Sequence, residues 1–276
     1  MTFAVRDQKN LWVRIITAIF GVAAILACIG YGGKTGVGIL AMMGAWGALA
    51  EYFTMIFPLE HKKHQKRMGI WAGLIISIPI ILNSFYLYET ITLSLMLLFL
   101  FYLILDMMKD SHEECLDDLA RSIFGIFYIS ILFSCWPKVC DLSHGKEWIF
   151  LVFIIPWFSD TAAYFGGKIF GKHKLAEAIS PKKTMEGAYA GVGASVLGVA
   201  LYKQFFFPEL TWIDVILLGT AGSVISQIVD LFESFVKRAA SVKDSGVIIP
   251  GHGGILDRFD GVLFCSPFIY FYARFW

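Results

Sequence analysis

The chain has 276 residues, of which 57% are hydrophobic, 16% aromatic and only 16% charged, with a formal net charge of +1. Soluble domains carry about 25% charged residues, so this composition excludes an ordinary soluble domain and indicates an integral membrane protein. The near-neutral charge gives no reason to expect nucleic acid as a partner.

Apolar segments, taken in chain order, predict about nine transmembrane helices. A helix needs about 20 mostly apolar residues to cross a bilayer, with a range of about 17–25. The candidate spans are 11–31, 36–57, 69–87, 90–105, 119–136, 148–166, 187–207, 211–234 and 260–275. The fourth and the ninth are short, and Phe275 and Trp276 are suited to anchor the ninth at the membrane surface. The fold class is therefore all-α and polytopic.

The distribution of basic residues predicts the orientation of these spans. Cytoplasmic loops are enriched in Lys and Arg, and nine spans with the N-terminus inside and the C-terminus outside place most of the 23 such residues on the inner side. We divide the chain into five N-terminal spans, residues 1–147, and a C-terminal catalytic region of four spans, residues 148–276. Two inner loops of this region, 166–187 and 235–260, are rich in Gly, Lys, Ser, Pro and Asp, so the active site is expected there.

Two acidic residues lie inside predicted spans. Asp160 sits about 18 Å into the span that begins at Trp148, at about 1.5 Å per residue. An ionised carboxylate at that depth costs about 2.5–3.5 kcal/mol on insertion scales, so we expect Asp160 to face a cavity, a metal or a cation rather than lipid. Glu51 poses the same question in the second span, where a structural and a functional role remain equally open.

Residues 234–261 combine hard oxygen ligands, cations and glycines in one short segment. The cations are Lys237, Arg238, Lys243 and Arg258, the carboxylates are Asp244, Asp257 and Asp260, and Gly251, Gly253 and Gly254 surround His252. Mg²⁺ prefers one or two carboxylates together with phosphate oxygens and water. A helix that begins near Asp257 also favours an anion at its N-terminus. The segment therefore predicts a magnesium–phosphate site, with an ordinary charged loop as the alternative.

A helical continuation of the eighth span places Asp230, Glu233, Ser234 and Lys237 on one face. The simplest alternative is a solvated helix end with a Glu233–Lys237 pair. In the other inner loop, Lys182 and Lys183 are suited to hold phosphates, although positive-inside signalling alone also explains them. The nearby Gly166–His173 stretch approaches a nucleotide P-loop, but it lacks the Ser/Thr that holds Mg²⁺ and follows a membrane span, so we reject that reading.

These residues resemble the signature of the phosphatidate cytidylyltransferase family, the CDP-diacylglycerol synthases. That signature has the form Ser-x-x-Lys-Arg, Lys-Asp, Pro-Gly-His-Gly-Gly and Asp-Arg-x-Asp. Its matching residues here are Ser234, Lys237, Arg238, Lys243, Asp244, Pro250 to Gly254, Asp257, Arg258 and Asp260. Residues 159–165, 180–187 and 230–234 are also similar to the family, except that Met185 stands where the family usually has Trp. The resemblance covers about residues 150–276.

The resemblance implies transfer of a cytidylyl group from CTP to phosphatidate, with pyrophosphate as the leaving group. It implies Mg²⁺ as the cofactor, together with a second cation, monovalent such as K⁺. The implied metal ligands are Asp230 and Asp257, and the implied catalytic residues are Lys237, Arg238, Lys243, Asp244, His252, Arg258 and Asp260. Substrate binding is implied for Asp160, Ser180, Lys182, Lys183, Thr184, Glu186, Ser234, Gly251, Gly253 and Gly254.

Two other functions remain to be distinguished. A CTP-dependent polyprenol or lipid kinase uses the same nucleotide but yields CDP and a lipid phosphate. An ion-coupled transporter would use Asp160 and Glu51 as ion sites, but it predicts matching halves, and the sequence has no visible repeat. The expected partners are phosphatidate, CTP and the lipid bilayer, with a homodimer left open. The expected location is the bacterial cytoplasmic membrane, with the active site facing the cytoplasm.

Overall fold

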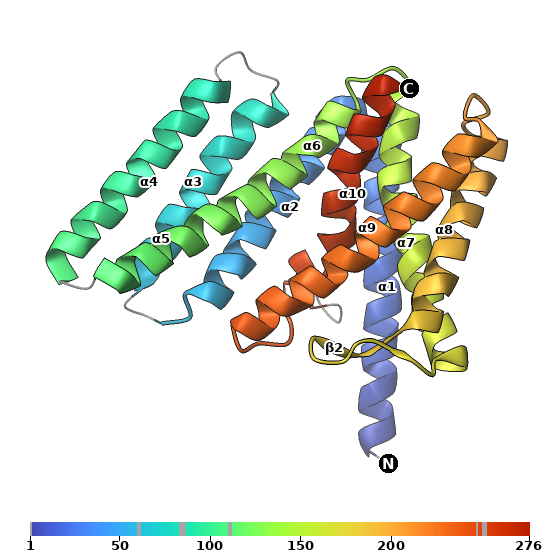
Figure 1. Ribbon diagram of the computed structural model, residues 1–276, viewed down its shortest axis with the longest axis horizontal. Helices are drawn as coiled ribbons and strands as arrows, with labels where there is room; N and C mark the ends of the chain where they lie inside the picture. The colour runs from blue at the N-terminus through green and yellow to red at the C-terminus, as the bar shows by residue number, and fades with distance from the viewer. Residues whose placement is uncertain (1, 60–61, 83–86, 110–111, 247, 250–252) are drawn as a thin grey trace. The chain divides into compact units, whose positions relative to one another are not determined.

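The computed structural model describes residues 2–59, 62–82, 87–109, 112–246, 248–249 and 253–276, and Figure 1 follows the chain by colour. The first half contains α1 (Thr2–Gly30), α2 (Gly33–Ile56), α3 (Lys63–Ile81) and α4 (Leu87–Lys109). A long helix follows, made of α5 (His112–Ile126), the π-helical turn η2 (Phe127–Ile131) and α6 (Leu132–Val139). The second half contains α7 (Gly145–Phe170), β1 (Lys174–Ala176), β2 (Ser180–Thr184), α8 (Met185–Phe205), α9 (Trp212–Ala239) and α10 (Leu256–Phe275).

Each predicted span overlaps one of these helices over most of its described residues, so the helical class predicted from the sequence is confirmed. In the described part of the chain, four helices are long and apolar enough to cross a membrane: Gly33–Ile56, His112–Val139, Gly145–Phe170 and Trp212–Ala239. Ile16–Gly30 and Leu93–Leu105 are shorter apolar helices. The count of nine spans and their orientation stay predictions.

The chain separates into two compact units. Unit 1 comprises Met1–Lys138 and Asp244–Arg258, and unit 2 comprises Val139–Lys243 and Phe259–Trp276. Residues 244–258, which link α9 to α10, therefore pack with the N-terminal helices although they lie late in the sequence. The predicted division of the chain between residues 147 and 148 stays a prediction.

Unit 1 is held together by large side chains that fill the space above glycines. The Tyr52 ring of α2 lies against Gly125 of α5, where a Cβ atom would collide with the ring. The Tyr52 hydroxyl also donates a hydrogen bond to the Arg121 carbonyl oxygen at 2.9 Å. Directly before α3, Lys62 Nζ lies 2.9 Å from carboxylate oxygens of both Glu114 and Asp118 of α5. These contacts hold α5 against α2 and against the start of α3.

Unit 2 is built on the mutual packing of α7, α8 and α9, which Figure 1 shows as neighbouring helices. Small residues allow close approach: a Cβ atom on Gly187 of α8 would lie only 2.7 Å from the Ala163 carbonyl oxygen of α7. The Ser195 hydroxyl of α8 donates to the Ile155 carbonyl oxygen at 2.8 Å. In a membrane, where helices gain little from apolar burial, small residues and interhelical hydrogen bonds are the expected means of association.

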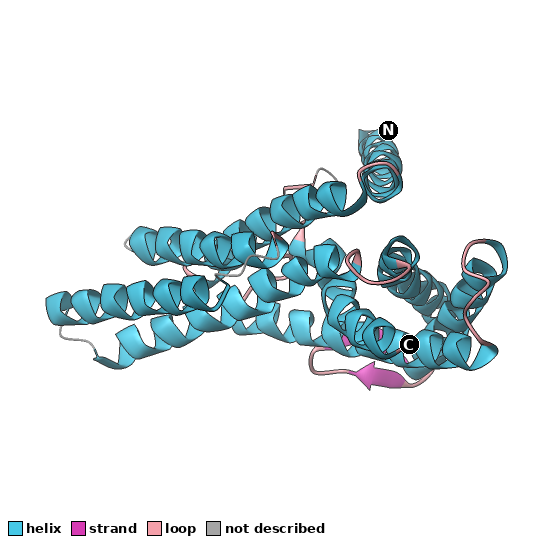
Figure 2. Ribbon diagram, turned by 90° about the horizontal axis from the view of Figure 1, so that it is seen from above, coloured by secondary structure: helices cyan, strands magenta, loops and turns pink. Residues whose placement is uncertain are grey.

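The inner loop between α7 and α8 contains an antiparallel hairpin of β1 and β2, which stands out in magenta in Figure 2. Sequence reasoning expects only a loop there. At the opposite end of the unit, Asp214 at the start of α9 accepts hydrogen bonds from the Tyr272 hydroxyl of α10 and from Nε1 of Trp276, the residue after that helix. None of the five cysteines, all of which are described, forms a disulfide.

Candidate active site

Unit 2 contains a cavity of about 520 Å³ between α7, α8, α9 and the hairpin. Ligand pockets typically measure about 300–1,000 Å³. Its polar lining residues are Asp160, Lys168, Ser180, Lys182, Lys183, Thr184, Gln227 and Asp230. The cavity thus brings together predicted site residues from three separate stretches of sequence. Asp160, which the sequence predicts to lie inside a membrane span, is one of these lining residues.

The closest charged contact in the cavity joins the hairpin to α9. Lys183 Nζ lies 2.5 Å from an Asp230 carboxylate oxygen, as a charge pair without the alignment of a hydrogen bond. The two side chains are 25% and 35% exposed, and both line the cavity, although the Lys183 Nζ atom itself is buried. A lysine beside a carboxylate suits a substrate that carries phosphate groups and a divalent cation, because the lysine can bind the phosphate oxygens and the carboxylate can bind the cation.

The hairpin is held at its base by Glu186 and Thr184. The Thr184 hydroxyl accepts from the Gly187 N–H and caps α8, as expected for a threonine at an N-cap. The Glu186 carboxylate accepts from the backbone N–H groups of Lys172 and His173 and contacts His173 Nδ1 at 2.6 Å. These hydrogen bonds, led by that from the Lys172 backbone, lower the pKa of Glu186 to about 2. Glu186 is therefore ionised at neutral pH and serves the hairpin, while its predicted contact with substrate stays a prediction.

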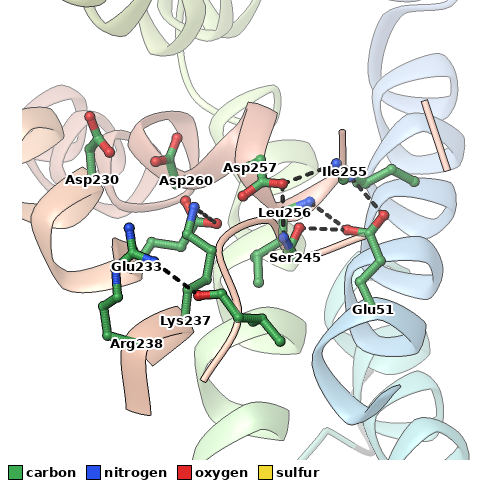
Figure 3. A network of polar contacts seen from close by, with 12 residues as sticks. Glu51, Asp230, Glu233, Lys237, Arg238, Ser245, Ile255, Leu256, Asp257 and Asp260 are labelled. Atoms are coloured by element: carbon green, nitrogen blue, oxygen red, sulfur yellow. Dashed lines mark hydrogen bonds and ion pairs between the residues drawn. The ribbon is translucent and has the colours of Figure 1, made fainter. Parts of the chain in front are cut away.

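Glu233 of α9 and Asp260 of α10 form a buried acidic pair within unit 2. Glu233 is 1% exposed and Asp260 is 8% exposed. Lys237 Nζ lies 3.2 Å from a Glu233 oxygen, so the pair named in the alternative interpretation is present, but Glu233 is buried and this part of the helix is not a solvated end. Figure 3 shows Lys237 extending toward Glu233 beside Asp260.

Asp257, in the first turn of α10, belongs to a network of hydrogen bonds within unit 1. Its Oδ2 atom accepts hydrogen bonds from the Ser245 and Gly254 backbone N–H groups, each at 3.0 Å. Gly254 and the adjacent Gly253, which has a φ of +90°, are two of the glycines predicted to contact phosphate. The Gly254 N–H instead points at Asp257. The anion expected at the start of α10 is supplied by the protein, since Glu51 accepts from the Ile255 and Leu256 N–H groups.

The other predicted catalytic residues lie near the ends of α9 and α10. Arg238 is exposed and donates to the Val242 carbonyl oxygen at 3.3 Å. Ser234 is half-buried on α9, and Lys243 and Asp244 follow that helix. Arg258 lies in the first turn of α10. Gly251 and His252 lie outside the described residues. The roles assigned to all of these residues stay predictions.

The donor set fits a magnesium ion that relies largely on its substrate for ligands. The predicted ligands are hard carboxylate oxygens, which Mg²⁺ prefers, and it usually takes only one or two from the protein. Within the described ranges, no three Asp, Glu, His or Cys side chains gather as a group that could hold a metal. Asp230 in the cavity of unit 2 and Asp257 in unit 1 remain the predicted ligands, and the second cation remains a prediction.

Sequence reasoning missed Gln227, which lines the cavity. Its side-chain NH₂ group donates to Ser223 Oγ at 3.0 Å and to the Ala188 carbonyl oxygen at 3.2 Å, and it lies 3.3 Å from Ser159 Oγ. This amide therefore links α7, α8 and α9 below the site. An isolated Gln in an apolar span is costly unless partnered, and that signal was present in the sequence.

The fold and the cavity define a class: a helical integral membrane protein with a lysine- and carboxylate-lined site at the ends of its helices. A family model described as the Cytidylyltransferase family matches residues 12–276. The chain belongs to this family.

Relatives with curated names point in the same direction. The phosphatidate cytidylyltransferase of Bacillus subtilis is 39% identical over 156 residues, which cover 56% of this chain and 58% of the relative. That of Staphylococcus epidermidis is 43% identical over 153 residues, covering 55% and 58%. That of Staphylococcus aureus is 43% identical over 156 residues, with the same two shares of 55% and 58%. The match thus spans somewhat over half the length of these relatives.

Proposed function

We propose that this protein transfers the cytidylyl group of CTP to phosphatidate, forming CDP-diacylglycerol and pyrophosphate. The observation that carries the proposal is the cavity in which Lys183 and Asp230 form a charge pair, in a chain that belongs to the cytidylyltransferase family. The names of the relatives supply the lipid substrate. The bacterial origin of the relatives supports placement in a bacterial cytoplasmic membrane, with the hairpin and the cavity on the cytoplasmic side.

The reaction requires positioning and charge neutralisation rather than a covalent enzyme intermediate. An oxygen of the lipid phosphate attacks the α-phosphorus of CTP, and the bond from that phosphorus to the bridging oxygen of the β-phosphate breaks. Pyrophosphate leaves with the electron pair of that bond. The lipid phosphate already carries negative charge near pH 7, so the nucleophile needs no protein base.

The chain's own residues have distinct proposed tasks. Lys182 and Lys183 bind phosphate oxygens at the cavity, and Asp230 holds a magnesium ion there. Magnesium, when bound, neutralises charge on phosphate oxygens and orients the reacting groups. Gln227 keeps α7, α8 and α9 in register below the site. The apolar parts of the cavity wall, such as Ala163, Leu175 and Ala188, exclude water from the reacting phosphates.

A single assay tests the proposal. The purified protein in detergent is given phosphatidate, CTP labelled in the cytosine ring and Mg²⁺, and pyrophosphate and lipid-linked cytidine are measured together. We expect equal amounts of the two products, and no products with EDTA. A parallel reaction receives diacylglycerol, which lacks the nucleophilic phosphate, and should yield neither product.

The other outcomes identify the competing functions. Formation of CDP with diacylglycerol or a polyprenol, without cytidine in the lipid, would identify a lipid kinase. A folded preparation that turns over none of these lipids would contradict the proposal, and ion-coupled transport would then be measured in proteoliposomes.

A further inference from the structure

The Glu51 carboxylate in the middle of unit 1 binds a segment about 200 residues away in sequence. Glu51 lies on α2 and is 4% exposed. Its Oε1 atom accepts from the Ile255 N–H at 2.9 Å, and its Oε2 atom accepts from the Leu256 N–H at 3.0 Å and from Ser245 Oγ at 3.1 Å. Figure 3 shows the carboxylate enclosed by these three donors. All three belong to residues 244–258, the segment that precedes and begins α10.

This geometry makes Glu51 a helix cap supplied by another helix. The first N–H groups of a helix have no acceptor within it, and a negative charge near them is favourable. The chain starts α10 at Leu256, and Glu51 accepts from that residue and from the one before it. The carboxylate therefore fixes both the place and the direction in which α10 begins.

The approach of the segment to α2 depends on missing side chains. A Cβ atom on Gly246 would lie 2.6 Å from Glu51 Oε1, and one on Gly254 would lie 2.5 Å from Glu51 Oε2. One helical turn before Glu51, the Ile255 side chain occupies the space beside Gly47, where a Cβ atom would collide with it. The segment therefore contacts α2 in two places one helical turn apart: the Ile255 side chain packs at Gly47, and the backbone binds the buried Glu51 carboxylate.

Asp257 is connected to Glu51 through the same residues. Ser245 donates its hydroxyl to Glu51 and its backbone N–H to Asp257 Oδ2. Gly254 donates to Asp257 from the residue directly before the Glu51-bound Ile255. A shift of Glu51 would therefore move both backbone donors that orient the Asp257 carboxylate. A hydrophobic contact alone would anchor the segment without setting the direction of these N–H groups.

We propose that Glu51 is a positioning residue for the transferase reaction: it orients the Asp257 carboxylate through Ser245 and the start of α10, without touching substrate. This inference rests on the proposed function. It answers a question that the sequence leaves open, because Glu51 lies in an apolar span with no motif around it. The geometry assigns it to the functional segment at the other end of the chain.

The test compares Glu51→Gln with Glu51→Asp and with the control Glu113→Gln, which changes an exposed acid at the start of α5. Glutamine keeps the size of the side chain but presents an NH₂ group to one of the three donors. We expect Glu51→Gln to lower kcat by about tenfold or more while the KM values for CTP and phosphatidate change by less than about threefold. It should also raise the Mg²⁺ concentration needed for half-maximal rate. Glu51→Asp keeps the charge on a shorter side chain, and its kcat should fall between those of Glu51→Gln and the wild type. The kcat of Glu113→Gln should match that of the wild type.

A second measurement does not depend on turnover. Hydrogen exchange of the Ile255 and Leu256 amides should accelerate by about tenfold or more in Glu51→Gln, since each loses a charged acceptor, while amides of α9 stay unchanged. Unchanged exchange would overturn the proposal, and so would faster exchange with wild-type kcat. If the wild type itself makes no CDP-diacylglycerol, the proposed function fails, and the exchange data then decide separately whether Glu51 holds the segment.

Discussion

Lys182 and Lys183 are neighbours in sequence but have different surroundings at the cavity. Lys182 is exposed on β2, whereas Lys183 is partly buried and lies against Asp230. A charge held in a cavity is screened less by water and salt than one on the surface. The two lysines therefore offer a matched pair for measuring what the cavity contributes to phosphate binding.

Lys183→Met should lower kcat/KM by about 10- to 100-fold, the range expected for losing one hydrogen bond to a charged group. Lys182→Met should cost about fivefold or less, because exposed charges contribute about 0–1 kcal/mol. Steady-state kinetics with phosphatidate and CTP varied separately would show which substrate each lysine serves. Equal losses for the two variants would contradict the distinction between them.

Asp257→Asn should lower turnover by about 100-fold or more, on the scale of removing one electrostatic contact to a transition state. Asparagine retains an oxygen for the Ser245 and Gly254 N–H groups, so membrane insertion and thermal stability should stay close to those of the wild type. The measurement combines turnover with the yield of folded protein in detergent. An active Asp257→Asn protein would rule out a role as metal ligand.

At the scale of single residues, the sequence predicts those site residues whose side chains are suited to the expected substrate and metal. Lysines, aspartates and glycines near residues 180–187 and 234–261 stand out because phosphate and Mg²⁺ need those groups. The partners of Glu51 do not stand out, because two of them are backbone N–H groups, which every residue except proline carries, and the third is a serine hydroxyl. Gln227 was overlooked for a different reason: its role is to join three helices, and those neighbours are set by packing rather than by spacing along the chain.

At the scale of elements, the hairpin between α7 and α8 is the main feature that the sequence does not reveal. β1 and β2 are too short for an alternating pattern, and Pro181 within β2 argues against a strand. The pair is closed instead by local contacts, among them Lys174 Nζ with the Pro181 carbonyl oxygen at 2.6 Å and Glu186 with Lys172 and His173. Long apolar helices, by contrast, are predicted well because membrane thickness fixes their length.

The Glu186 contacts should persist across the whole neutral range of pH. The folded-state pKa of Glu186 is about 2, below the ordinary value of about 4.3, so its stabilisation is present above about pH 4.3 and is lost as the pH falls toward 2. The measurement is the ratio of hydrogen-exchange rates at the Lys172 and His173 amides between Glu186→Gln and the wild type. That ratio should be constant from about pH 5 to 8 and should approach one near pH 2. A change centred near pH 6 would contradict this assignment.

Because α8 packs closely on α7, we expect alanine substitutions at two glycines of α8 to have opposite effects on the stability of the protein. Gly187→Ala places a methyl group 2.7 Å from the Ala163 carbonyl oxygen and should destabilise the protein by about 1–3 kcal/mol. A Cβ atom on Gly193, also on α8, would have nothing within 4 Å, and Gly193→Ala should be neutral or stabilising by up to about 1 kcal/mol. Thermal unfolding of both variants in one detergent tests this, and equal midpoints would contradict it.

At the scale of the whole molecule, the sequence order and the structural division differ. Residues 244–258 carry much of the family signature, yet they pack with unit 1, while α9 and most of α10 belong to unit 2. Sequence alone suggests one C-terminal catalytic region because the motifs are contiguous there. The first half of the chain, which the family model also matches from residue 12 but which carries none of the signature residues, therefore contributes Glu51 as a support for the motif segment.

The orientation of the spans sets which compartment supplies the nucleotide, and it gives the last prediction. With nine spans and the N-terminus inside, the hairpin faces the cytoplasm and the turn between α8 and α9 faces outward. In a variant without its native cysteines, Lys174→Cys should react with a membrane-impermeant maleimide only after spheroplasts are permeabilised. Glu209→Cys should react before permeabilisation, because both residues are exposed on short connections at opposite ends of α8. The opposite pattern would place the cavity on the side without CTP and would contradict both the orientation and the proposed reaction, while equal labelling of the two sites would show that α8 does not cross the membrane.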